Sequence, residues 1–282
     1  MTATVFDDRP CHLGEGPLWH PDRQELFWFD IMGKRLLSRG AEGSREWQFD
    51  AHFSAGGLVD AETLLIASET GLWRFDITTG TRELLCPLEA DRPETRSNDG
   101  RADAQGGFWI GTMGKEAQEG IGAIYRYYKG ELRKLVEGIT IPNAICFAPD
   151  GRTAYHSCTR SQIIQRQPLD AEGWPEGPAT PFLDLRAEGL NPDGAVVDAE
   201  GYLWNAQWGA ARVARYAPDG SLDRTVAVGG RHSSCPAFGG ADLTTLFVTT
   251  AQENIPDPGP AEGLVYAAEV GVTGQREHRV QL

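Results

Sequence analysis

The sequence of 282 residues has few cysteines, no long apolar run and no pattern typical of a helix. Its five cysteines are scattered, and no Cys-x-x-Cys pair occurs, which argues against a disulfide framework and against a zinc knuckle. No stretch approaches the roughly 18 apolar residues of a membrane-spanning helix, and the N-terminus lacks the basic and apolar parts of a signal peptide. We therefore expect a cytoplasmic protein that has no membrane partner.

Basic residues are also scarce, because 26 Lys and Arg stand against 40 Asp and Glu and give a formal net charge of −14. No basic stripe offsets this charge, so we expect no nucleic-acid partner. Solubility accounts for the acidic balance itself. What is abundant is glycine and proline, at 34 and 17 residues, together with 8 tryptophans and 11 phenylalanines. This composition favours many short strands joined by tight turns.

One pattern recurs six times: an apolar run, an aspartate with small or polar neighbours, and then an aromatic or β-branched run. The spacings between these aspartates are 38, 43, 47, 48 and 44 residues, about the length of a four-stranded propeller blade. Segments 71–85 and 122–136 between them have the alternation of hairpins. The sequence thus predicts a single all-β domain over residues 1–282, a six-bladed β-propeller, whereas paired β-sandwiches would leave six near-equal periods unexplained. The aspartates, interpreted as turn residues, are Asp22, Asp60, Asp103, Asp150, Asp198 and Asp242.

Four repeats carry a carboxylate or amide at matching depth, five to seven residues ahead of the repeat's aspartate: Glu15, Asn98, Asn143 and Asp193. The first strand of each propeller blade lines the central channel, so equal depth predicts convergence on the axis. Glycines and prolines around these positions fit a crowded backbone. An oxygen-only cluster suits a hard divalent cation such as Ca²⁺, Mg²⁺ or Mn²⁺. The alternative for each residue alone is a polar strand end satisfied by buried water.

Five segments, in this order and spacing, resemble the family of senescence marker protein 30, gluconolactonase and luciferin-regenerating enzyme. The resemblance covers essentially the whole chain and is nearest to bacterial aldonolactonases, including xylonolactonases. It implies a six-bladed propeller that holds one divalent metal ion in its channel and hydrolyses a sugar lactone, its small-molecule partner, as a monomer or weak homo-oligomer. The segments are LGEGPLWHP, RSNDGRADAQGGFWIGTMG, IPNAICFAPDGRTAYH, NPDGAVVDAEGYLWNAQWG and SCPAFGGADLTTLFVTTA.

The resemblance assigns the metal ligands and the catalytic base residue by residue. Glu15, Asn143 and Asp193 match the family's glutamate, asparagine and aspartate ligands. Asp193 is also expected to accept a proton from the attacking water. Ca²⁺ is the favoured ion, with Zn²⁺, Mn²⁺, Mg²⁺ and Fe²⁺ as alternatives.

The resemblance also assigns substrate contacts. Arg96 and Asn98 match a pair that contacts substrate oxygens, and Glu119 corresponds to a glutamate just ahead of the strand GAIYRY. From the repeat pattern, Trp208 is the aromatic residue best placed to face a sugar ring, its alternative being packing between sheets.

Two positions depart from the family's pattern. Ala144 stands where the residue after the asparagine ligand is usually glycine, and Cys158 stands where relatives commonly have aspartate. If that aspartate supports the site electrostatically, Cys158 would weaken metal binding or alter substrate choice.

The predicted function is metal-dependent hydrolysis of an aldonolactone to the aldonic acid in carbohydrate catabolism. One alternative is a non-catalytic propeller in which the ion only stabilises the channel and the protein binds a partner. Another is an aryl-ester or organophosphate hydrolase on the same scaffold. Arg96 and Asn98 favour an enzyme, because a purely structural ion needs neither residue.

Overall fold

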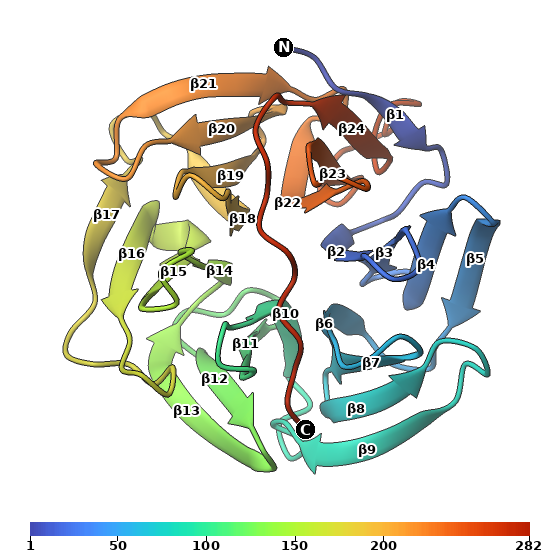
Figure 1. Ribbon diagram of the computed structural model, residues 1–282, viewed down its shortest axis with the longest axis vertical. Coiled ribbons are helices and arrows are strands. Elements are labelled where there is room, and N and C mark those ends of the chain that lie inside the picture. Colours follow the sequence, from blue (N-terminus) through green and yellow to red (C-terminus); the bar gives the residue numbers. More distant parts are fainter.

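The computed structural model describes all 282 residues and contains six antiparallel sheets of four strands, arranged in a ring (Figure 1). Blade 1 consists of β2 (Gly14–His20), β3 (Glu25–Asp30), β4 (Arg35–Gly40) and β5 (Gly43–Gln48), and blade 2 of β6 (Phe53–Leu58), β7 (Thr63–Ser68), β8 (Gly71–Asp76) and β9 (Arg82–Pro87). Blade 3 consists of β10 (Thr95–Ala102), β11 (Phe108–Gly114), β12 (Gly122–Tyr128) and β13 (Glu131–Ile139), and blade 4 of β14 (Pro142–Phe147), β15 (Thr153–Cys158), β16 (Ile163–Pro168) and β17 (Thr180–Asp184). Blade 5 consists of β18 (Asn191–Val197), β19 (Leu203–Trp208), β20 (Arg212–Tyr216) and β21 (Leu222–Ala227), and blade 6 of β22 (His232–Gly239), β23 (Thr245–Ala251), β24 (Val265–Glu269) and β1 (Thr4–Asp7). The predicted all-β, six-bladed propeller is confirmed.

The only helical segment is the 3₁₀ turn η1 (Thr159–Ser161), so no helix of the structure has the length and apolar character needed to cross a membrane.

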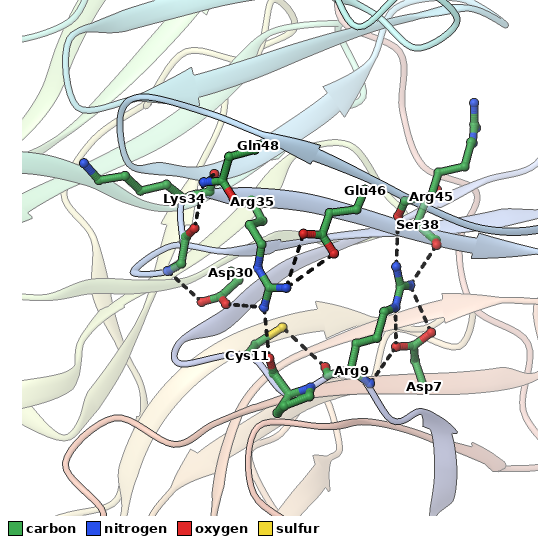
Figure 2. Close-up of polar contacts among 12 residues, drawn as sticks. Asp7, Arg9, Cys11, Asp30, Lys34, Arg35, Ser38, Arg45, Glu46 and Gln48 are labelled. Carbon is green, nitrogen blue, oxygen red and sulfur yellow. Dashed lines mark hydrogen bonds and ion pairs between the residues drawn. The ribbon is translucent and has the colours of Figure 1, made fainter.

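The two ends of the chain close the ring together in blade 6. Strand β1 is the outermost strand of this blade and pairs with β24, with Thr4 opposite Ala267. The segment after β1 is then fixed to blade 1 by Arg9, which donates hydrogen bonds to Asp7 Oδ1 at 2.9 Å and to the Ser38 carbonyl at 2.9 Å (Figure 2). Closure by strand pairing leaves the ring without a free gap between its first and last blades.

The C-terminal segment 270–282 runs across one end of the ring (Figure 1). Its backbone bonds to blades 2 and 3, with Val280 N donating to Leu58 O at 2.7 Å and Gln281 N to Gly106 O at 2.8 Å. Glu277 pairs with Arg101 near the end of β10. The inner strands therefore begin at the opposite end of the channel, which is the end that carries the predicted site residues.

The first strand of every blade has a break in its pairing register with the second strand. In β2 the break lies between Glu15 and Leu18, and in β14 it lies between Asn143 and Cys146. A bulge of this kind bends the strand and re-aims its side chains. Ala144 has a φ of 55°, the left-handed conformation that favours glycine, so the backbone at this position suits the glycine that the resemblance leads us to expect.

The six repeat aspartates fall into two classes that the sequence pattern does not separate. Four are exposed in turns, whereas Asp103 and Asp198 are fully buried. Asp198 Oδ2 accepts hydrogen bonds from Trp204 Nε1 at 2.9 Å and from Arg215 Nη2 at 2.6 Å. The interpretation of Asp198 as an ordinary turn residue is therefore wrong, because it anchors a buried ion pair inside blade 5.

Candidate active site

A cavity of about 540 Å³, here called the channel cavity, lies where the inner strands begin. This volume is in the range of small-molecule sites. Five of the predicted site residues line it together: Glu15, Arg96, Asn98, Asn143 and Asp193. They come from blades 1, 3, 4 and 5, so the structure brings together side chains that are up to 178 residues apart in the sequence.

The structure does not bring Glu119 to the channel cavity. Glu119 is exposed, and the loop after β11 instead turns Lys115 and Glu116 toward the cavity. The resemblance located this glutamate by its distance from β12, and the path of a loop does not follow from that distance.

Glu15 and Asp193 are buried carboxylates, with exposed fractions of 6% and 4%. Burial raises the pKa of Glu15 to about 8, and the charge of Asp99 adds to the effect. Burial likewise raises the pKa of Asp193 well above its usual range, and Glu15 is the charge that adds most to this. Two like charges in a low-dielectric site repel each other. A proton or a bound cation must therefore compensate them.

A chain of hydrogen bonds orients the amides of the cavity. Arg96 Nη1 donates to Asn98 Oδ1 at 2.8 Å, and Asn98 Nδ2 donates to Asn143 Oδ1 at 3.2 Å. Asn143 Nδ2 donates in turn to Thr159 Oγ1 at 2.8 Å. The Thr159 hydroxyl donates a hydrogen bond to the backbone carbonyl of Pro192 in blade 5 at 2.8 Å. The nitrogen of Asn143 is thereby occupied, and its oxygen is directed away from Thr159.

Thr159 was missed by sequence reasoning, although it directly follows Cys158 in the sequence. Only the fold brings its hydroxyl between blades 4 and 5. The buried Asp99 accepts a hydrogen bond from the backbone N–H of Ile145 at 2.7 Å and so links β10 to β14.

Arg96 is a buried guanidinium without an ion pair. Both of its hydrogen bonds to protein leave from Nη1, to Asn98 and to the Ser97 carbonyl. Burial lowers its pKa, and no carboxylate contacts it directly. Its Nε and Nη2 groups are thus available to an oxygen-rich ligand in the cavity.

The donors in the channel cavity fit a hard divalent cation. Its wall contains carboxylates, amides and a hydroxyl, but no imidazole or thiol, which is the chemistry that Ca²⁺ and Mg²⁺ prefer. The structure contains no cluster of three or more His, Cys, Asp or Glu side chains able to hold a metal. An ion held by Glu15 and Asp193 would therefore depend on the Asn143 amide as its third donor.

The other positions that the sequence singled out differ in whether they line the channel cavity. Trp208 lines the cavity and stacks on His232, with ring centroids 4.2 Å apart. Cys158 does not line the cavity: it packs against the apolar cluster between blades 3 and 4 that contains Trp109. The missing aspartate at this position therefore changes packing between blades and not the lining of the cavity.

Comparison with known proteins shows the family and agrees with the fold. Residues 13–252 match the family model described as SMP-30/Gluconolactonase/LRE-like region. The structure of a calcium-binding protein, regucalcin, from Agrobacterium tumefaciens strain C58 superposes with a TM-score of 0.97 at 39% identity, covering 100% of this chain and 98% of that one. The L-arabinolactonase of Azospirillum brasilense is 33% identical over 98% of this chain and 95% of its own, and the 6-deoxy-6-sulfogluconolactonase of Pseudomonas putida is 32% identical over 95% of each. The two relatives from Azospirillum and Pseudomonas are named as lactonases, and the chain belongs to the SMP-30/gluconolactonase/LRE-like family.

Proposed function

We propose that this protein hydrolyses a five- or six-membered aldonolactone to the aldonic acid and that it does so with one divalent cation, Ca²⁺ being favoured. The observation that carries the proposal is a single cavity in which two buried carboxylates, Glu15 and Asp193, lie with the unpaired guanidinium of Arg96. The names of the lactonase relatives support the same reaction class.

Glu15, Asn143 and Asp193 would hold the cation through oxygen atoms. When bound, the ion supplies Lewis acidity toward the lactone carbonyl and lowers the pKa of a water molecule. A compensating cation would also remove the electrostatic cost of keeping two carboxylates buried at neutral pH.

Asp193 is the proposed proton acceptor. The attacking water gives its proton to the Asp193 carboxylate as the water oxygen bonds to the carbonyl carbon. The ring C–O bond then breaks, and the departing ring oxygen takes the proton from Asp193 to become a hydroxyl, which restores the Asp193 carboxylate. Burial raises the pKa of Asp193 when no cation is bound, and a bound cation would oppose this shift. The base need not have a pKa near 7, because the cation makes the attacking water more acidic.

The remaining residues position the lactone. Arg96 and Asn98 would bind substrate oxygens, which holds the carbonyl in reach of the water. Thr159 orients the Asn143 amide by accepting its N–H. Trp208, already stacked on His232, would offer its free face to the apolar side of the sugar ring.

The test is a panel of aldonolactones assayed with metal-stripped protein, re-supplied with one cation at a time and corrected for spontaneous hydrolysis at each pH. We expect turnover that depends on added metal. A phosphotriester or aryl ester turned over faster than every lactone would support the alternative hydrolase. Tight metal binding without turnover of any of these substrates would support a non-catalytic propeller.

A further inference from the structure

A carboxylate outside the sequence motifs, Glu253, lines the channel cavity from the loop between β23 and β24. Its backbone is fixed at both polar groups. The Glu253 N–H donates to His12 O at 2.9 Å, and its carbonyl accepts from His232 Nδ1 at 2.9 Å. His232 in turn stacks on Trp208. Blades 1, 5 and 6 together therefore hold this loop residue in place.

The Glu253 carboxylate itself is half-buried, and no protein group donates a hydrogen bond to it. By contrast, Glu69, which lies near the same cavity, is paired with Lys115 and His52. A carboxylate that is fixed in a cavity wall and has no protein partner is available to a ligand.

The group that Glu253 faces electrostatically is Arg96. Burial lowers the pKa of Arg96, and among the carboxylates that oppose this effect Glu253 is the strongest, ahead of Glu15 and Asp193. Its influence on Glu15 and Asp193 is the weakest of the main influences on each. Glu253 and Arg96 line the same cavity, and this order of influences favours a role for Glu253 beside Arg96 over a role among the proposed metal ligands.

Arg96 and Glu253 form no direct ion pair, so a gap separates a donor-only group from an acceptor-only group. A sugar hydroxyl is both a donor and an acceptor, and it satisfies both groups at once. An ether oxygen or an apolar substituent cannot do so, and it would leave a buried charge unsatisfied.

We propose that Glu253 and Arg96 jointly bind one hydroxyl group of the sugar lactone and thereby determine which aldonolactones are hydrolysed. Glu253 accepts the hydroxyl proton, and Arg96 donates to the hydroxyl oxygen. This assignment rests on the proposed function and adds to it a specificity residue on the β23–β24 loop.

The experiment compares Glu253→Ala and Glu253→Gln with the wild type on a parent lactone and on its single-deoxy and epimeric analogues, at saturating metal. Glu253→Ala should lower kcat/KM for the parent by about 10- to 100-fold, the range for a hydrogen bond to a charged group, mainly through KM. With the wild type, the analogue that lacks the contacted hydroxyl should have a kcat/KM lower than that of the parent by the same factor. The Glu253→Ala substitution should not lower kcat/KM for this analogue any further. Glu253→Gln should recover part of the loss, because its amide oxygen can still accept.

Asp257→Asn is the matched control, because it removes an exposed carboxylate from the same loop outside the cavity wall, and it should behave as wild type. Equal losses on every analogue would overturn the assignment. So would a drop in metal affinity of more than about 10-fold, which would make Glu253 a metal ligand. An active wild type with an unchanged Glu253→Ala variant refutes the assignment alone, whereas a wild type inactive on all lactones refutes the proposed function as well.

Discussion

His156 gives the sharpest test of the electrostatics, because it is a titratable group buried without partners. It lies on β15 with an exposed fraction of 6%, and neither ring nitrogen has a hydrogen-bond partner. Side chains alternate along a strand, so it shares a face with Ala154 and Cys158, which pack on the apolar cluster between blades 3 and 4. Burial in this setting lowers the pKa of His156 from 6.5 to about 4.

This shift makes the free energy of unfolding depend on pH. Between pH 6.5 and pH 4 the unfolded chain binds a proton at His156 that the folded protein does not bind. The stability associated with neutral His156 is therefore fully present above pH 6.5 and falls as the pH drops toward 4. At 1.36 kcal/mol per pKa unit, the loss is about 3 kcal/mol across this window.

The change to measure is His156→Leu, which keeps an apolar side chain at the position and removes the titration. Denaturant unfolding of metal-free wild type and variant is followed at several values from pH 7 to pH 4. Titrations of Glu15, Asp99 and other groups are common to both proteins and cancel in the difference. We expect the stability of the variant relative to wild type to rise by about 3 kcal/mol toward acid. Parallel stability–pH curves for His156→Leu and wild type would refute the reasoning.

Three further predictions concern the site and its support. Asp193→Asn should lower background-corrected lactone turnover by about 10²-fold or more; near-normal turnover with metal bound would mean that another group is the base. Asp198→Asn should destabilise the fold by about 3 kcal/mol, because it leaves Arg215 with a broken buried pair. Urea unfolding measures this change, and the control Asp150→Asn, in an exposed turn, should change the free energy of unfolding by no more than about 1 kcal/mol. Cys158→Asp should cost about 1–3 kcal/mol of stability by placing a carboxylate against an apolar cluster and should leave metal affinity unchanged in calorimetric titration. A changed affinity with unchanged stability would instead connect position 158 with the site.

The architecture of the ring could be predicted because it depends on a repeated local pattern. Six repeat aspartates at near-equal spacings are enough to set the number of blades and the position of each inner strand. The closure of blade 6 by β1 could not be predicted in the same way. Strand β1 has four residues and pairs with a strand more than 250 residues later, and no local pattern encodes such a pairing.

The repeat pattern does not distinguish the aspartates that form buried ion pairs from those that are exposed in turns. Asp103 and Asp198 directly follow the last paired residue of their inner strands, whereas Asp150 comes three residues after β14. Only the first two can reach the arginine on the third strand of their blade. The residue type and the local sequence are alike, and the buried ion pair depends on a register that only the sheet reveals.

The site residues were found where depth in the repeat determines position, and they were missed where it does not. Glu15, Asn98, Asn143 and Asp193 lie at or beside the bulges of their inner strands, so their spacing from the repeat aspartate located them. Glu116, Thr159 and Glu253 come from the ends and loops beyond these strands. Loop paths depend on tertiary contacts such as that of Glu253 with His12, and no periodicity reports them.

The six bulges also show how one repeated backbone feature yields a single asymmetric site. In blades 2 and 6 the residue inside the bulge is a serine, Ser54 or Ser234. Ser54 donates to Ser97 Oγ at 2.7 Å, and Ser234 donates to the carbonyl of Gly14. These short side chains tie neighbouring inner strands together and do not reach into the channel cavity. The space that they leave allows longer carboxylates and amides from the inner strands of the other blades to share one cavity with a ligand, so the inner strands of blades 2 and 6 contribute to the site by the volume that they do not fill.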